Sequence, residues 1–97
     1  MGLRSEREAR YQVKLYRRVD VGDPPTYWLY VCSYDQRPRA TRPEGMSAQE
    51  SAEWVARSDI YLRNPNADIY ELTQDAFHED HQYGDCDYVL ILCRVDG

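Results

Sequence analysis

Residues 47–62 read SAQESAEWVARSDIYL, a helical pattern that stands between two pairs of predicted strands. Ser47 and Glu50 have the spacing of a capping box, in which each side chain accepts a hydrogen bond from the backbone N–H of the other residue. The sequence Asn64-Pro65-Asn66 ends the pattern. The apolar stripe is made mostly of small side chains, so the helix can lie close to a sheet. Its members are Ala48, Ala52, Val55, Ala56, Ile60 and Leu62.

Two strand patterns precede this helix. From Tyr11 to Val19 apolar residues alternate with polar ones, which is typical of a strand with one solvent-exposed face. Residues 26–34 have aromatic or apolar side chains on both faces, and their alternation places Trp28, Tyr30 and Tyr34 together on one of them. The segment between the two patterns, VGDPP at residues 21–25, predicts a hairpin loop because its prolines lack a backbone donor.

Two further strand patterns follow the helix. Residues 88–95 have apolar side chains on both faces, which favours a central position in a sheet. Residues 67–73 form a weaker pattern, since their anchors Ile69 and Leu72 do not strictly alternate. Residues 74–87 between them predict a long acidic loop. The order ββαββ predicts an α+β fold, a four-stranded antiparallel sheet with one helix packed on one face.

The length and composition limit the class of protein. Ninety-seven residues allow one domain, and we expect residues 1–10 to form a flexible N-terminal tail and residues 11–97 a single α+β domain. Hydrophobic residues make up 42% of the chain and charged residues 30%. The first value excludes intrinsic disorder and the second an integral membrane protein.

The cysteines indicate a reducing compartment. Cys32, Cys86 and Cys93 are odd in number and lack the spacing of a disulfide framework. The first residues lack the basic and then apolar pattern of a signal peptide. We therefore expect a cytoplasmic location, with thiols that act as small apolar side chains.

The charges are divided unevenly along the chain. The net charge is -5, yet residues 1–43 hold nine basic and five acidic groups, whereas residues 44–97 hold three basic and twelve acidic groups. Residues 68–87 contain seven carboxylates and neither Lys nor Arg. These carboxylates are Asp68, Glu71, Asp75, Glu79, Asp80, Asp85 and Asp87.

This acidic run predicts a negative surface that complements a groove lined by arginine and lysine, often one built for nucleic acid. Its field extends over a Debye length, about 8 to 10 Å at physiological salt. Two other interpretations stay open. The run is also compatible with a solvated loop that aids solubility, or with neutralisation by Arg17, Arg18 or the arginines of residues 37–42.

Aromatic residues are numerous, with nine tyrosines and two tryptophans. One helix covers one face of a sheet, so we expect the opposite face to show part of an aromatic set that is typical of an interface. Alternatively, these rings close a small core and keep their hydroxyls at its rim. The set comprises Tyr16, Trp28, Tyr30, Tyr34, Tyr70 and Tyr88.

Metal and catalytic motifs are weak. His78, His81 and Cys86 lie close in sequence. A zinc site usually takes its ligands from two pairs of residues that are separated in the sequence, and a second pair is absent here. A Cys86/His81 dyad is disfavoured, because Asp85 and Asp87 would raise the pKa of the thiol. The sequence lacks a nucleophile elbow, a phosphate-binding Gly-rich loop and a His-Glu-x-x-His motif. We expect no metal, no cofactor and no catalytic residue.

Residues 35–46 form a basic connector in which Arg37, Arg39 and Arg42 are separated by prolines. Arginines near aromatic residues are typical of single-stranded nucleic-acid binding. A single-stranded nucleic-acid-binding module is therefore the second hypothesis, and a metal-dependent hydrolase is the third.

The first hypothesis is a small acidic, non-enzymatic binding protein without membrane contact. It would be an inhibitor or adaptor that docks on a basic, nucleic-acid-binding surface of a protein or nucleoprotein partner. By analogy of class alone, phage-borne inhibitors of bacterial defence complexes are such proteins. Five carboxylates supply the charge and two aromatic residues the anchors of this predicted surface: Asp75, Glu79, Asp80, Asp85, Asp87, Trp28 and Tyr30.

Overall fold

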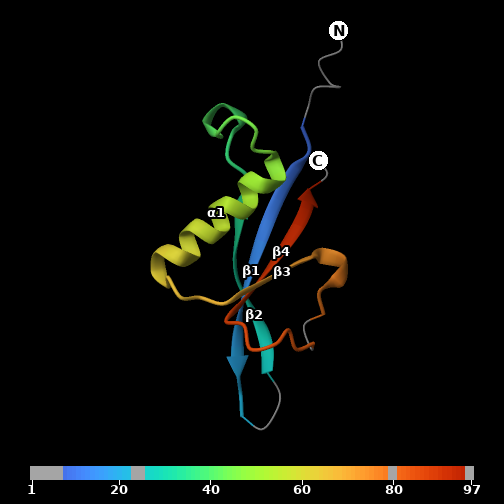
Figure 1. Cartoon of the computed structure of the whole chain (residues 1–97). Coiled ribbons are helices and arrows are strands. Elements are labelled where there is room, and N and C mark those ends of the chain that lie inside the picture. The colour runs from blue at the N-terminus through green and yellow to red at the C-terminus, as the bar shows by residue number, and fades with distance from the viewer. Residues whose placement is uncertain (1–7, 23–25, 79–80, 96–97) are drawn as a thin grey trace.

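The computed structural model describes residues 8–22, 26–78 and 81–95. A four-stranded sheet carries one α-helix on one face (Figure 1). The chain follows the predicted ββαββ order in outline, with two short 3-10 turns added. The elements are β1 (Arg10–Asp20), β2 (Thr26–Asp35), η2 (Arg39–Thr41), α1 (Ala48–Arg63), β3 (Ile69–Thr73), η3 (Gln74–Ala76) and β4 (Tyr88–Val95).

The helix begins where the sequence predicts. The Ser47 hydroxyl accepts a hydrogen bond from the Glu50 backbone N–H at 3.1 Å, and the Glu50 carboxylate accepts one from the Ser47 N–H at 3.0 Å. These bonds to Ser47 lower the pKa of Glu50. In the part of the chain that the structure describes, α1 is the one α-helix, and it is neither long nor apolar enough to cross a bilayer.

The strand order is β2-β1-β4-β3. β1 pairs antiparallel with both β2 and β4, so the α+β class is confirmed. β4 is a central strand, as its apolar residues on both faces predict. The long β1 and β2 strands continue as a two-stranded ribbon beyond Arg17, the last β1 residue that pairs with β4.

The prediction of a purely antiparallel sheet is wrong, because β3 runs parallel to β4. Residues 74–87 do not turn back as a hairpin. Phe77 and Tyr83 of this link pack on the sheet face opposite α1, and the chain then enters β4 from the end at which β3 began. Parallel neighbours need a connection of about a dozen residues or more, and this link supplies it.

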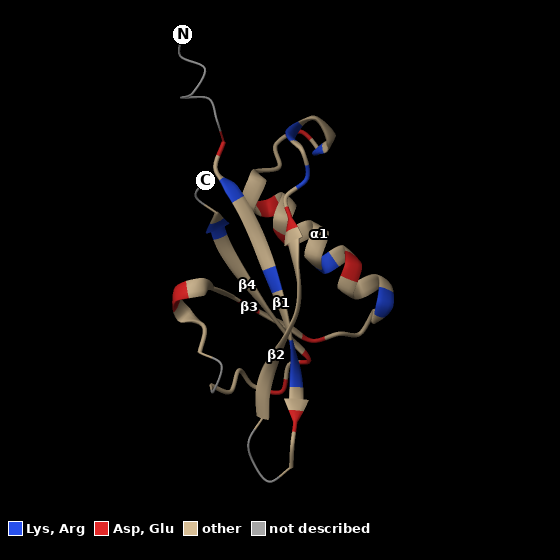
Figure 2. Cartoon of the chain, turned by 180° about the vertical axis from the view of Figure 1, so that it is seen from behind, with Lys and Arg blue, Asp and Glu red and all other residues tan. Residues whose placement is uncertain are grey.

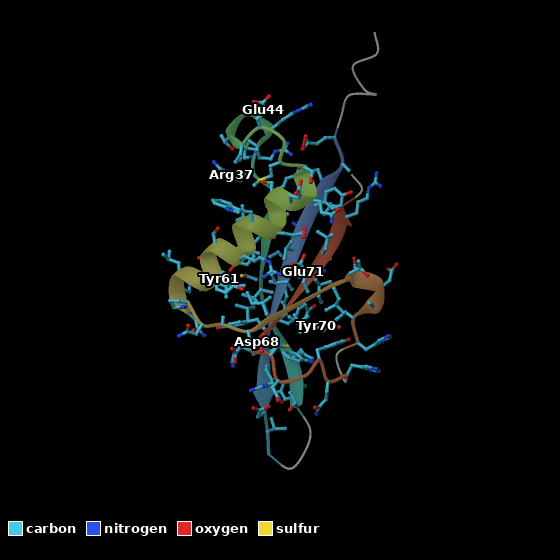
Figure 3. All side chains as sticks on the ribbon, in the orientation of Figure 1. Arg37, Glu44, Tyr61, Asp68, Tyr70 and Glu71 are labelled. Atoms are coloured by element: carbon cyan, nitrogen blue, oxygen red, sulfur yellow. The ribbon has the colours of Figure 1, made fainter. Side chains whose placement is uncertain are left out.

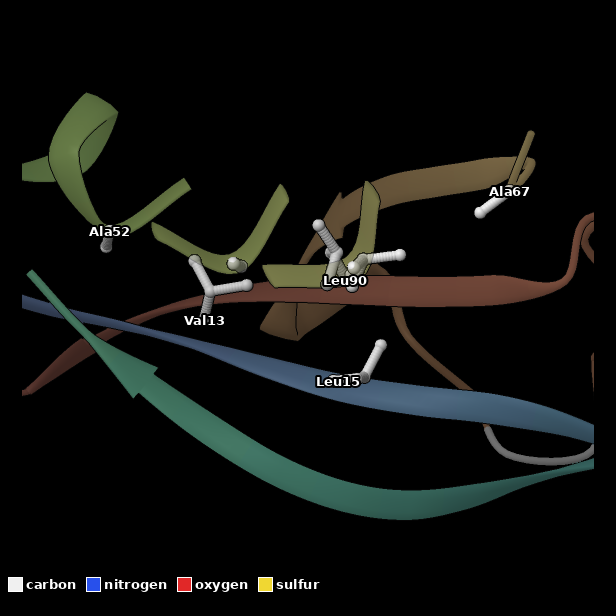
Figure 4. Close-up of a cluster of buried hydrophobic side chains, with 7 residues drawn as sticks. Val13, Leu15, Ala52, Ala67 and Leu90 are labelled. Atoms are coloured by element: carbon white, nitrogen blue, oxygen red, sulfur yellow. The ribbon is translucent and has the colours of Figure 1, made fainter. Parts of the chain in front are cut away.

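Small residues of α1 let the helix lie close to the sheet. Ala52 and Ala56 are fully buried against Val13 and Leu90. Figure 4 shows Val13, Leu15 and Leu90 under the helix, with Ala67 at the edge of the same cluster. This first core lies between α1 and the middle strands.

A second core lies on the opposite face of the sheet. Trp28 and Cys86 are each 4% exposed there and contact the buried side chains of β4. The cover comes from the β3–β4 link, which contributes Phe77 and Tyr83. The expected open aromatic face is therefore largely covered, and Tyr30 and Tyr70 are the members of the predicted set that are about half exposed.

A β-bulge in β2 separates side chains that strict alternation would place together. Leu15 pairs with Cys32, but the next residue, Tyr16, pairs with Tyr30, which leaves Val31 as the extra residue. Beyond the bulge the faces of β2 are exchanged. Tyr34 therefore packs in the first core and Trp28 in the second, contrary to the shared face that the sequence predicts.

The described chain starts before the predicted tail boundary. Arg10 is already the first residue of β1, and Glu8 accepts hydrogen bonds from Gln36 and Arg42. The rest of the predicted tail, residues 1–7, lies outside the described residues.

Candidate protein-binding surface

A groove runs along the outer edge of the sheet between β3 and the end of the β3–β4 link. Its volume is about 410 Å³. We call it the acidic groove; its lining includes Asp68, Tyr70, Tyr83, Gly84, Asp85 and Cys86. Figure 3 shows Asp68 and Tyr70 near the start of β3.

Tyr83 organises the wall of this groove. Its ring stacks on Tyr70 at a centroid distance of 5.4 Å and on Phe77 at 6.0 Å. Its hydroxyl oxygen accepts a hydrogen bond from the His78 backbone N–H at 2.7 Å. Gly84 follows with a φ of 70°, a left-handed conformation that glycine adopts without strain. The ring thus joins the link to the sheet, and the hydroxyl joins two parts of the link to each other.

The structure brings three carboxylates of the acidic run together. Asp68 and Asp85 are exposed and line the groove. Asp87 is half-buried, and its side chain accepts a hydrogen bond from the Asp68 N–H at 2.9 Å. Asp75 is exposed too, but it lies in η3 and lines a separate groove with Arg94. Asp85 and Asp87 are thus close together, and Asp75 is apart from them.

Two predicted members of the surface have no described position. Glu79 and Asp80 lie outside the described residues.

Five arginines of the described chain are paired with other carboxylates. In the described ranges the ion pairs do not involve Asp68, Asp75, Asp85 or Asp87. Figure 2 shows the basic residues of the 37–42 connector far from the acidic positions at the start of β3. The pairs are Arg18–Asp20, Arg39–Glu8, Arg42–Glu8, Arg57–Glu71 and Arg63–Asp59.

Arg18 is bonded to the acidic run through its backbone. Its backbone N–H donates to the Asp87 carbonyl at 3.1 Å, while its guanidinium lies 3.5 Å from Asp20. Internal neutralisation is therefore partial at most, and the carboxylates of Asp68 and Asp85 face solvent.

The two predicted aromatic anchors differ in exposure. Trp28 is 4% exposed, and its indole N–H donates to the His81 carbonyl at 2.9 Å. Its prediction as a surface anchor is therefore wrong, because the bulge at Val31 turns it under the β3–β4 link. Tyr30 is 50% exposed on the ribbon and lies away from the acidic groove lining.

Sequence reasoning missed Tyr83 and did not select Tyr70 as a binding residue. Tyr70 is 47% exposed beside Asp68, where its ring is available at the groove. No local signal identifies Tyr83, because its contact with Tyr70 forms only when the link crosses the sheet face.

The basic connector does not form a continuous cationic surface. The Arg42 side chain is 5% exposed, and its guanidinium donates to both carboxylate oxygens of Glu8. Arg37 lies over the Trp54 ring at 5.3 Å. Arg39 is 79% exposed and lies 4.0 Å from Glu8. One of the three predicted nucleic-acid-binding arginines is therefore well exposed.

The Cys86 thiol is bonded within the fold, and the rings of His78 and His81 lie beside each other. Cys86 donates a hydrogen bond to the Tyr83 carbonyl at 3.1 Å. Burial raises the pKa of the Cys86 thiol, and the negative charge of Asp68 raises it further. The rings of His78 and His81 lie 5.3 Å apart. No group of three or more potential metal ligands occurs among the described residues.

Comparisons with protein-family models, curated protein sequences and solved structures found no match for this chain. The proposals below therefore rest on the geometry and charge of the described surfaces.

Proposed function

We propose that this chain is a small acidic, non-enzymatic binding protein that docks through its acidic groove on a basic surface of a protein partner. The observation that carries the proposal is the combination of two carboxylates, Asp68 and Asp85, with the exposed ring of Tyr70 in one groove. Neither of these two carboxylates is part of an ion pair among the described residues.

The chemistry of the groove fits an arginine or lysine side chain. A guanidinium forms charge-assisted hydrogen bonds with carboxylates and stacks on aromatic faces. Tyr70 is held in place by its stacking on Tyr83, so the ring loses little additional freedom when a cation binds. The field of Asp85 and its neighbours accelerates encounter with a basic partner.

Arginine and lysine side chains line nucleic-acid-binding grooves. The proposed role is therefore that of an inhibitor or adaptor that binds such a groove. Inhibitors carried by phages against bacterial defence complexes belong to this class by analogy of charge and size. A single-stranded nucleic-acid-binding role has less support, because Arg42 is buried against Glu8 and Arg37 lies on Trp54.

Charge reversal at the groove tests the proposal. We expect Asp85→Lys to weaken capture of a basic protein from host extract roughly tenfold or more at low salt, because an attractive contact becomes repulsive. Asp85 is exposed, so the free energy of unfolding should change by less than about 0.5 kcal/mol. The measurement is quantitative affinity capture with mass spectrometry at low and high salt.

The matched control is Glu44→Lys, which makes the same charge change at an exposed site outside the groove. It should retain the partner. Equal capture by wild type and Asp85→Lys, or capture of nucleic acid alone, would exclude the acidic groove as the docking site.

A further inference from the structure

A further concave surface lies on the α1 side of the sheet, where the end of the helix meets β1 and β2. Its volume is about 200 Å³. Leu15 and Ile60 form its buried floor, and Val31 and Tyr88 line its walls. Arg17 and Arg63 also line it, and we call this surface the ribbon pocket.

The bulge at Val31 extends this apolar surface along the ribbon. It turns Leu29 and Tyr27 to the face that carries Leu15 and Arg17, since Arg17 pairs with Leu29 and Val19 with Tyr27. Leu29, Val31 and Tyr27 are each more than 40% exposed. α1 ends at Arg63 and leaves these three side chains largely uncovered. The pocket thus opens onto an exposed apolar strip.

The rim of the ribbon pocket has a positive balance of charge. Arg17 forms no ion pair within the described part of the chain. Arg63 is 71% exposed and lies 3.1 Å from Asp59. The Asp59 carboxylate also accepts a hydrogen bond from the Tyr34 hydroxyl at 2.5 Å. The rim thus holds two guanidinium groups and one carboxylate, and that carboxylate is already bonded to Arg63 and Tyr34. The rim therefore complements a further anion.

The strand beside the pocket has an open backbone edge. β2 is an edge strand of the sheet, and its sequence TYWLYVCSYD contains neither lysine nor proline, two residues that protect such edges. The bulge interrupts the edge at one residue and leaves Thr26–Tyr30 regular. An extended segment can add to an edge of this kind through main-chain hydrogen bonds.

We propose that the ribbon pocket receives one aromatic or branched aliphatic side chain from an extended segment of a partner protein, with a carboxylate of the same segment bound by Arg17 and Arg63. The volume suits one such side chain, since an apolar cavity of about 150 Å³ holds benzene. The ribbon pocket lies beside the β2 edge of the sheet, whereas the acidic groove lies at the β3 edge. The ribbon pocket binds an anionic segment, and the acidic groove binds a cationic one.

Selection of short random peptides displayed on phage tests this proposal. On the wild-type protein we expect enrichment of peptides in which an apolar residue lies within two positions of Asp or Glu. The enriched peptide, made synthetically, should shift the backbone amide resonances of Leu29 and Val31. Arg17→Glu should weaken its binding roughly tenfold or more, because it removes a charge-assisted hydrogen bond and adds repulsion.

Two variants serve as controls. Arg39→Glu makes the same charge change at an exposed arginine outside the pocket and should leave the peptide affinity unchanged. Asp85→Lys should also retain the peptide, which separates this site from the acidic groove. A thermal melt of Arg17→Glu establishes that the variant is folded.

Three results would overturn the inference. The first is an absence of acidic-apolar enrichment, and the second is equal peptide affinity for wild type and Arg17→Glu. The third is concentration-dependent dimerisation that Arg17→Glu abolishes, because the occupant would then be a second copy of this chain.

Discussion

At the scale of single residues, Tyr83 connects the β3–β4 link to the rest of the molecule. Its ring contacts Tyr70, Phe77 and Trp28, and its hydroxyl accepts from the His78 backbone. One side chain thus holds both the cover of the second core and the wall of the acidic groove. Loss of this residue should affect stability and binding together.

We expect Tyr83→Ala to lower the free energy of unfolding by about 1 to 3 kcal/mol, less than for a fully buried aromatic because the ring is half-buried. Tyr83→Phe keeps the stacking and loses the hydroxyl, at a cost of about 1 kcal/mol. Urea unfolding followed by tryptophan fluorescence measures both changes. Tyr27→Ala, at a 41% exposed ring, is the control, and an equal loss in both alanine variants would contradict this role.

At the scale of elements, α1 and β3 meet through a group of charged side chains. The Arg57 guanidinium donates to Glu71 at 2.5 Å, and Glu71 lies on β3 facing the helix (Figure 3). Glu53 lies one helical turn before Arg57. Burial raises the pKa of Glu53 from 4.5 to about 7, and the neighbouring Glu71 carboxylate raises it as well, against the smaller effect of Arg57.

This raised pKa predicts a loss of stability as the pH increases. Between 4.5 and about 7 the folded state holds a proton on Glu53 that the unfolded state has released, so the free energy of unfolding falls across this range. We expect Glu53→Gln to reduce the slope between these pH values. Thermal melts at several pH values measure it, with Glu44→Gln as the exposed control; an unchanged slope in Glu53→Gln would be contrary evidence.

At the scale of the whole molecule, the acidic groove and the basic connector lie on different surfaces. The carboxylates of the acidic groove lie at the start of β3, while the arginines of the 37–42 connector are held by Glu8 and Trp54. A net charge of -5 adds general repulsion from nucleic acid.

We therefore expect no retention of a labelled single-stranded oligonucleotide, even at about 50 mM salt where phosphate contacts are strong. A filter-binding or anisotropy titration measures this directly. Salt-sensitive binding that disappears in Arg39→Ala would favour the nucleic-acid hypothesis instead.

The sequence was informative wherever the signal was local. The Ser47 and Glu50 side chains predict the start of α1, because both partners of the capping box lie within one helical turn. The apolar residues on both faces of β4 indicate its central place. Asp85 and Asp87 are close in space because they are two residues apart.

Long-range features escaped prediction for physical reasons. Side chains alternate along a strand in the same way whether it pairs parallel or antiparallel. The parallel pairing of β3 and β4 was therefore not predicted. The single extra residue at Val31 changes which face Trp28 occupies without altering the composition of β2. The groove depends on the contact between Tyr70 and Tyr83, which the crossing link creates.

The position of β4 has a consequence for synthesis of the protein. β4 is the last element in chain order, yet it lies between β1 and β3 and joins them. β4 emerges from the ribosome after every other described element, so the emerging chain exposes apolar surface that β4 later covers. The sheet therefore closes only after Val95 has emerged, and until then we expect the nascent chain to be prone to aggregation.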